Sequence, residues 1–183
     1  GLALSRLGIR VVGADLAPNV GGIVDPVIGE RARERFGQEI ELWLGTQTRL
    51  ERSTSGIVMH ADGRKAEVEL LLAALGRRPN ADSLGLEAPG FPLDERGTPR
   101  FDPTTMQVGE LPVFIAGDAN ADRPLMHEAA DEGAIAGYNA ARETPTRFWR
   151  KVPLGIAFSD PDIAAVGMRF DALPTYGVVV GTG

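Results

Sequence analysis

The stretch Ile9-Arg10-Val11-Val12-Gly13-Ala14-Asp15 decides the fold that we expect for the first part of the chain. It is a short apolar run, interrupted by Arg10, and it predicts a buried strand with a carboxylate at its C-terminal end. Residues 1–8 predict the last two turns of a helix, because Leu4 and Leu7 share a face and a glycine follows them. The two segments together predict a helix that leads directly into a buried strand.

A helix, a glycine, a buried strand and a terminal acid, in this order, are the second half of a Rossmann βαβ unit. In a complete unit the acid lies about 20 residues after the first glycine of the loop G-x-G-x-x-G, so that loop would lie before residue 1. We therefore expect an internal fragment of a longer protein. Asp15 would accept hydrogen bonds from the adenosine ribose hydroxyls and repel a 2′-phosphate, which favours NAD over NADP. The alternative is a strand-end acid that starts a turn over residues 15–19.

The next segment predicts a helix and a strand. Asp25 and Pro26 suit the N-cap and the first helical position, and Gly37 suits the helix end. Residues 39–44 alternate in polarity, which predicts a half-buried strand. The apolar face of that strand would carry Ile40, Leu42 and Leu44, and the opposite face would carry Glu39, Glu41 and Trp43.

A β-meander is predicted after this strand. Residues 57–60 and 66–69 are strand-like, and Asp62-Gly63 between them is a strong signal for a hairpin turn. Residues 70–75 are an unbroken apolar run, as expected of a strand that is covered on both faces.

Gly76 follows that apolar run directly, and Arg77 and Arg78 come next. A glycine at the carboxyl end of a parallel strand lies where an open α/β sheet receives its ligand, and it lets a cofactor approach the backbone closely. The alternative is a loop glycine followed by two solvated arginines.

The second half of the chain contains another strand that ends in an acid. Residues 92–102 predict a small hairpin with a turn at residues 94–97. Residues 112–118 then predict a short buried strand that ends in Gly117 and Asp118. An aspartate in this position can bind a sugar or polyol hydroxyl, and the glycine leaves space for it.

A helix is predicted from Leu125 to about Ala141. Small residues recur along one face at four-residue spacing: Ala129, Gly133, Gly137 and Ala141. Each glycine costs about 1 kcal/mol of helix stability relative to alanine, so the stripe suggests close packing against a sheet or a ligand. The first turn has unpaired N–H groups that suit a carbonyl gaining negative charge. His127 in that turn is a candidate acid or base, with a capping or surface role as the alternative.

Composition excludes several classes of function. The chain of 183 residues has 25 acidic and 19 basic residues, a net charge of −6, so no basic surface for nucleic acid or anionic membranes is expected. No apolar stretch is long enough to span a bilayer. The absence of cysteine excludes a disulfide scaffold and a thiolate zinc site within these residues, and two histidines make no multi-histidine metal site. We expect a cytoplasmic protein without a metal.

In this order the segments resemble the flavin-dependent pyridine nucleotide–disulfide oxidoreductases, most closely the dihydrolipoamide dehydrogenases. The resemblance covers nearly the whole chain. It is carried by residues 7–15, 20–25, 74–80, 113–118, 125–133 and 158–167. It implies two cofactors, NAD and FAD.

The resemblance also implies a role for individual residues. For NAD, Asp15 would bind the ribose, Thr48 would line the adenine pocket and Gly76 would lie near the nicotinamide half. For FAD, Gly117 and Asp118 would bind the ribitol. The flavin ring would face the backbone at Leu125, Met126 and His127.

The fold class that follows is α/β with three parts. Residues 1–78 would form an incomplete Rossmann-like NAD domain with a three-stranded β-meander. Residues 79–145 would be the second segment of an FAD domain. Residues 146–183 would start an α+β dimerisation domain, so we expect the parent protein to be a homodimer.

The family reaction passes hydride between nicotinamide and flavin, and electrons between flavin and a disulfide. It requires two cysteines and a histidine base held by an acid, so none of these 183 residues is expected to be catalytic. We expect an inactive fragment of a parent that acts on a small-molecule or lipoyl-domain dithiol such as dihydrolipoamide. The alternatives are a non-catalytic binding or assembly module on the same scaffold, a soluble transhydrogenase, and a mercuric or glutathione-type reductase.

Overall fold

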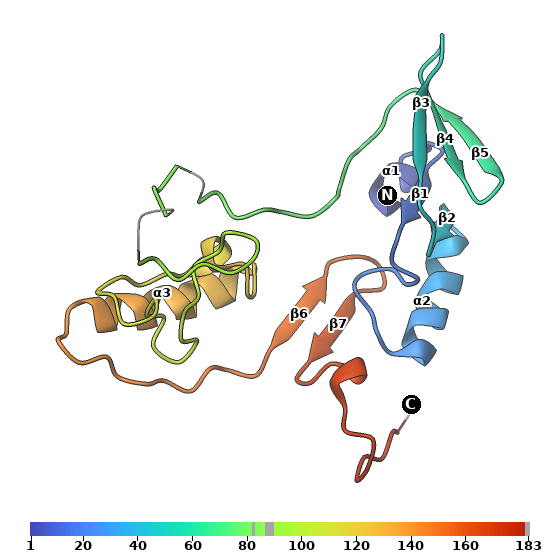
Figure 1. Cartoon of the computed structure of the whole chain (residues 1–183). Helices are drawn as coiled ribbons and strands as arrows, with labels where there is room; N and C mark the ends of the chain where they lie inside the picture. The colour runs from blue at the N-terminus through green and yellow to red at the C-terminus, as the bar shows by residue number, and fades with distance from the viewer. Residues whose placement is uncertain (82, 87–89, 182–183) are drawn as a thin grey trace. The chain divides into compact units, whose positions relative to one another are not determined.

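The computed structural model describes residues 1–81, 83–86 and 90–181 (Figure 1). The chain divides into two compact units, each considered by itself below. The first contains residues 1–73 and 152–183, and the second contains residues 74–151. Each unit mixes helices with strands or extended segments, which confirms the α/β character of the chain.

The first unit opens with the predicted half of a βαβ unit. Helix α1 (Leu2–Arg6) precedes strand β1 (Val12–Asp15), which pairs in parallel with β2 (Glu41–Leu44). Helix α2 (Pro26–Gly37) connects the two strands. As predicted, Asp25 is its N-cap, and the Asp25 carboxylate accepts hydrogen bonds from the backbone N–H groups of Val27 and Ile28.

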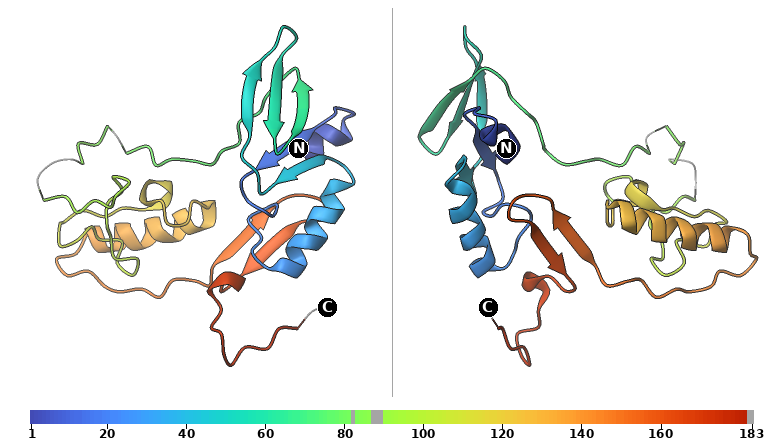
Figure 2. Two further views of the ribbon diagram at one scale, coloured as in Figure 1. Left: turned by 45° about the vertical axis from the view of Figure 1, so that its right-hand side comes forward. Right: turned by 180° about the vertical axis from the view of Figure 1, so that it is seen from behind.

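The β-meander is also present. Strands β3 (Arg49–Arg52), β4 (Ile57–Ala61) and β5 (Arg64–Val68) form an antiparallel sheet in chain order, as Figure 2 shows. The turn between β4 and β5 has positive φ at both Asp62 and Gly63, at 47° and 76°. That geometry suits a two-residue hairpin and explains why the Asp-Gly pair predicts it.

The core of this unit lies on the face of β2 that was predicted to be polar. Trp43 is 1% exposed and packs with Met59, Ala61 and Ala66 of the meander. The expectation that the Ile40, Leu42 and Leu44 face would be the buried one is therefore wrong, since those residues are only half-buried. The meander covers the face of β2 that carries Trp43. The indole N–H of Trp43 donates to the Glu41 carboxylate at 2.8 Å.

Residues 70–75 do not form the predicted strand. Leu70, Leu72 and Leu75 are 89%, 76% and 94% exposed, and no described strand pairs with this segment. A strand obtains its backbone hydrogen bonds from a neighbouring strand, so an apolar run without a neighbour stays irregular.

Residues 152–183 add a hairpin to the first unit. Strands β6 (Leu154–Ala157) and β7 (Ile163–Val166) pair antiparallel, and a short 3₁₀ helix, η2 (Phe170–Ala172), follows. Arg6 on α1 connects this hairpin to the rest of the unit. Its guanidinium contacts the carboxylates of Glu39 at 2.6 Å and Asp160 at 2.9 Å.

The ion pair between Arg6 and Glu39 should make the stability of the fold sensitive to low pH. The hydrogen bond from Arg6, with the charges of Arg6 and Arg35, lowers the pKa of Glu39 from 4.5 to about 2. A carboxyl with a lower pKa in the folded state stabilises the fold above its unfolded pKa and loses that contribution as the pH falls through the folded pKa. Glu39→Gln should therefore reduce stability at pH 6 and have little effect near pH 2. Urea unfolding of the wild type and of Glu39→Gln between pH 2 and pH 6 measures this change in stability. A difference in the free energy of unfolding that is constant with pH would contradict the prediction.

The second unit is built on helix α3 (Met126–Ala140), close to its predicted bounds. The hairpin of residues 92–102 is confirmed by a bridge between Leu93 and Pro99. Residues 112–118 form no regular strand. Only Phe114 makes a bridge, to Gln107, and a 3₁₀ helix, η1 (Gly117–Asn120), ends the segment. The pairing is confined to this bridge and to two backbone hydrogen bonds, from the Val108 N–H to the Val113 carbonyl and from the Ile115 N–H to the Met106 carbonyl, so the predicted strand over the whole segment is wrong.

The stripe of small residues on α3 packs closely at one point. Gly117 lies against Ala129, whereas no described atom comes within 4 Å of a Cβ built on Gly133 or Gly137. At Gly133 and Gly137 the described chain supplies no packing partner, so close packing there against a sheet or a ligand stays a prediction. The core of this unit lies elsewhere and includes Met106 and Val108, both 0% exposed.

Candidate functional site

The C-terminal end of β1 presents an exposed carboxylate at Asp15. Its Oδ1 accepts a hydrogen bond from the Ala17 N–H at 2.9 Å, so Asp15 does start a turn. The Asp15 carbonyl accepts a hydrogen bond from the Thr46 N–H at 3.1 Å, which places Thr46, just beyond the end of β2, beside Asp15. One bond to Ala17 leaves a carboxylate with further acceptor capacity. The turn and a ribose-binding role are therefore compatible.

Two threonines lie beyond the end of β2. Thr46 is 4% exposed, and its hydroxyl has no hydrogen-bond partner in the described ranges. A buried hydroxyl without a partner is uncommon. Thr48, the predicted adenine-pocket residue, is half-buried before β3 begins. The exposed Asp15 carboxylate is suited to a sugar with free hydroxyls, such as the ribose of NAD.

Gly76 belongs to the second unit. It has a φ of 92°, where side chains are strained, and open space lies where a Cβ would be. A backbone of this form can lie close to a ligand. Arg77 after it is exposed but not free, because its guanidinium donates to Asp118 Oδ2 at 3.0 Å and to the Pro124 carbonyl.

The segment from Gly117 to Pro124 leads into α3. Gly117 has a φ of 69°, and a Cβ there would lie 3.2 Å from the Ala129 Cβ, so only glycine fits without strain. Its N–H donates to Glu132 Oε2 at 2.7 Å, and Asn120 Nδ2 donates to the same oxygen at 2.7 Å. Glu132 therefore fixes η1 from the buried side.

Glu132 belongs to a buried ionic cluster. Glu132 is 0% exposed and Glu128 is 3% exposed, and both carboxylates contact Arg150, at 2.8 and 2.6 Å. Burial alone would raise the pKa of Glu128, but the hydrogen bond from Arg150 and the charge of Arg123 outweigh it and lower that pKa. Both carboxylates of the cluster lie against the Arg150 guanidinium, as buried acidic groups require a partner.

The N-terminus of α3 completes this region. Leu125 is its N-cap, and no side chain caps the helix there. Met126 is 89% exposed, and His127 is also exposed. Asp118 lies in η1, before the start of α3, and its side chain is 51% exposed. An exposed carboxylate suits a group with hydroxyls, such as the ribitol of FAD. An uncapped helix start suits a carbonyl that gains negative charge, such as that of the flavin ring.

Sequence reasoning did not identify Glu132, Asn120, Arg150 or Thr46. Glu132, Asn120 and Arg150 act through side-chain contacts with residues 12 or more positions away, so their neighbours in the sequence carry no signal. Thr46 was missed because its burial depends on how the strands pack. Arg77 could have been identified, because a cation directly after Gly76 in a ligand-binding loop is a reasonable partner for an acid elsewhere.

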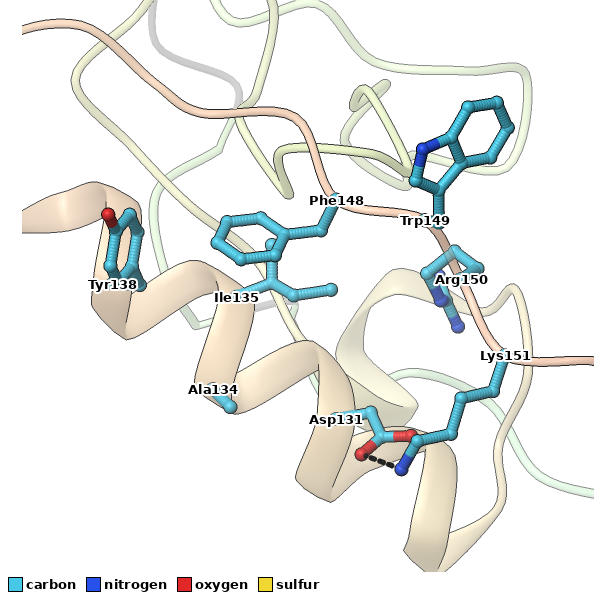
Figure 3. A pocket seen from close by; sticks show the side chains of 8 residues that line it. All are labelled: Asp131, Ala134, Ile135, Tyr138, Phe148, Trp149, Arg150 and Lys151. Atoms are coloured by element: carbon cyan, nitrogen blue, oxygen red, sulfur yellow. Dashed lines mark hydrogen bonds and ion pairs between the residues drawn. The ribbon is translucent and has the colours of Figure 1, made fainter.

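A surface hollow lies between α3 and residues 148–151 (Figure 3). Its volume is about 350 Å³, and its lining includes Tyr138, Phe148 and the exposed Trp149. Asp131 and Lys151 make an ion pair at 2.8 Å across one end of it. None of the predicted site residues lines this hollow.

Two classes of site find no support in the described ranges. No helix there has the length and apolar composition needed to cross a membrane. No group of three or more histidine, aspartate or glutamate side chains in the same part of the chain is arranged to hold a metal ion.

Comparison with protein families gives one match. The family of pyridine nucleotide-disulphide oxidoreductases matches residues 1–133. Members of this family use FAD and a pyridine nucleotide.

Two proteins of similar sequence are dihydrolipoyl dehydrogenases. The mitochondrial dihydrolipoyl dehydrogenase of Sus scrofa is 31% identical over 97% of this chain, and the dihydrolipoyl dehydrogenase of Halobacterium salinarum is 30% identical over 97%. The chain spans 36% and 39% of the length of these relatives.

Among solved structures, LpdA from Mycobacterium tuberculosis matches with a TM-score of 0.79 and 26% identity. The match covers 93% of this chain and 38% of LpdA. A water-forming NADH oxidase from Lactobacillus brevis, bound to NADH, matches with a TM-score of 0.78 over 93% of this chain and 40% of its own. At 20% identity the second likeness concerns the fold alone.

Proposed function

The chain belongs to the pyridine nucleotide-disulphide oxidoreductases, and from this premise we propose that it is part of a flavoprotein of the dihydrolipoyl dehydrogenase type. That protein would transfer electrons between NAD(H), FAD and a dithiol or disulfide substrate such as dihydrolipoamide. The observation that carries the proposal is the exposed Asp118 carboxylate, which lies after Gly117 and before the uncapped start of α3.

We assign the adenosine half of NAD to the end of the β1–β2 pair. Asp15 would accept hydrogen bonds from the adenosine ribose, with the buried Thr46 hydroxyl beside it and Thr48 lining the adenine pocket. Its negative charge would disfavour a ribose that carries a 2′-phosphate. Gly76 would let the nicotinamide half lie close to the backbone.

We assign FAD to the segment that joins η1 to α3. Asp118 would accept hydrogen bonds from the ribitol, and Gly117 would keep that approach open. The backbone at Leu125, Met126 and His127 would face the flavin ring with the positive end of the helix. Bound FAD would supply the two-electron chemistry, and this chain would orient it.

The residues that react with the dithiol would lie outside these 183 residues, since the chain contains no cysteine. The chain spans about a third of its relatives, so a larger protein would supply them. We accordingly propose that the isolated chain has no turnover. A homodimer of the larger protein would cover apolar side chains that are exposed here, such as Trp149 and Phe158.

Asp118→Asn tests the FAD assignment in the whole flavoprotein. The amide keeps the shape but loses the charge-assisted hydrogen bonds to the ribitol, so FAD should bind about five- to tenfold more weakly. The measurement is quenching of FAD fluorescence on titration into the apoprotein. Asp131→Asn removes a similar charge from an exposed ion pair of the same unit and should leave FAD affinity unchanged. Equal affinity in wild type and Asp118→Asn would remove the assignment.

A further inference from the structure

We propose that Arg77 is a positioning residue of the flavin site, which it serves by holding Asp118 and the start of α3 at a fixed spacing. The inference rests on the proposed role of Asp118 in binding FAD. It gives a function to the arginine that directly follows Gly76, the glycine assigned to the nicotinamide half of NAD.

Arg77 contacts both ends of one segment. Its Nη1 donates to Asp118 Oδ2 at 3.0 Å, and its Nη2 donates to the carbonyl of Pro124. Pro124 directly precedes Leu125, the N-cap of α3. One guanidinium therefore connects the carboxylate proposed to bind the ribitol with the helix start proposed to face the ring.

The same segment is fixed differently on its buried side. There Glu132 accepts hydrogen bonds from the Gly117 N–H and from Asn120, and Glu132 is fully buried. Arg123 also bonds to the buried Glu128, at 3.3 Å, and Asp122 lies 3.9 Å from Arg150. Arg77 adds an attachment from the exposed side, at Asp118 and at the Pro124 carbonyl.

The chemistry of arginine suits this task. Its planar guanidinium has several donors in a fixed arrangement and can bind two acceptors at once, whereas a lysine ammonium is a compact charge on a flexible stem. Asp118 uses Oδ2 for Arg77, and a carboxylate has acceptor sites beyond one such bond. The contact therefore orients Asp118 without consuming its capacity for a sugar hydroxyl.

Exposure sets the size of the expected effect. The side chains of Arg77 and Asp118 are 64% and 51% exposed, so the pair by itself stabilises the fold little. If Arg77 positions the flavin site, its replacement should weaken FAD binding clearly and change the stability of the apoprotein little. In Arg77→Gln, FAD should bind roughly three- to tenfold more weakly, while the thermal midpoint of the apoprotein changes little.

A double-mutant cycle in the whole flavoprotein tests this, with FAD affinity measured by fluorescence titration. If Arg77 acts through Asp118, Arg77→Gln combined with Asp118→Asn should bind FAD within about twofold of Asp118→Asn alone. Arg77→Lys should recover only part of the lost affinity, since it keeps the charge and loses the paired donors. Lys151→Gln removes a cation from the Asp131–Lys151 pair of the same unit and is the matched control.

The outcomes separate the two proposals. If Asp118→Asn weakens FAD binding and Arg77→Gln does not, or if their effects multiply, the positioning role is wrong and the FAD site stands. If Asp118→Asn has no effect, the FAD assignment itself fails. If Arg77→Gln clearly lowers the thermal midpoint of the apoprotein as well as weakening FAD binding, Arg77 is structural and the inference is overturned.

Discussion

Replacing Glu132 by alanine is expected to lower the free energy of unfolding by about 3–5 kcal/mol. The carboxylate is fully buried and accepts hydrogen bonds from the Gly117 N–H and Asn120, and it contacts Arg150. Its loss leaves two buried donors, the Gly117 N–H and Asn120 Nδ2, without their acceptor, and Arg150 keeps Glu128 as its buried partner. Because η1 is fixed by these bonds, FAD affinity should fall in the same variant. Urea unfolding of the apoprotein measures the first effect, and fluorescence titration measures the second.

Two variants control this prediction. Glu132→Gln keeps the shape and one acceptor oxygen but removes the charge that faces Arg150, so its effect should be intermediate. Glu143→Ala removes an exposed carboxylate just after α3 and should change the free energy of unfolding by less than about 0.5 kcal/mol. A cost below about 1 kcal/mol for Glu132→Ala would show that the buried cluster does not hold the loop.

A neutral residue at position 15 should reverse part of the nucleotide preference. In Asp15→Asn the amide oxygen can still accept the Ala17 N–H, so the turn is preserved. The charge-assisted hydrogen bonds to the ribose are lost, and NADH should bind about ten- to a hundredfold more weakly. NADPH should bind equally well or better, because the repulsion of its 2′-phosphate is removed.

The NADH and NADPH dissociation constants of the whole protein test this second prediction. Asp25→Asn is the matched control, since Asp25 also accepts backbone N–H groups at the start of an element and carries the same charge. It should leave the ratio of the two constants unchanged. An unchanged ratio in Asp15→Asn would remove Asp15 from the NAD site.

Features set by neighbouring residues were predictable from the sequence. The strand ending at Asp15, the cap at Asp25 and the turn at Asp62-Gly63 depend on local conformation and hydrogen bonds within a few residues. The helix after Leu125 was predictable for the same reason. The order of these elements was enough to indicate the family.

Features set by distant partners were not predictable in the same way. Residues 70–75 have the composition of a buried strand, but a strand needs a neighbour that composition does not specify. Trp43 is buried because the meander packs on its face of β2, which alternation alone does not reveal. The contacts of Glu132 with Gly117, and of Arg77 with Asp118, join residues 15 and 41 positions apart.

A crystal structure of the whole protein with FAD and NADH bound tests the central claim most directly. We predict a carboxylate oxygen of Asp118 within about 3.2 Å of a ribitol hydroxyl, and one of Asp15 at the same distance from an adenosine ribose hydroxyl. Either cofactor bound away from its aspartate would contradict the account.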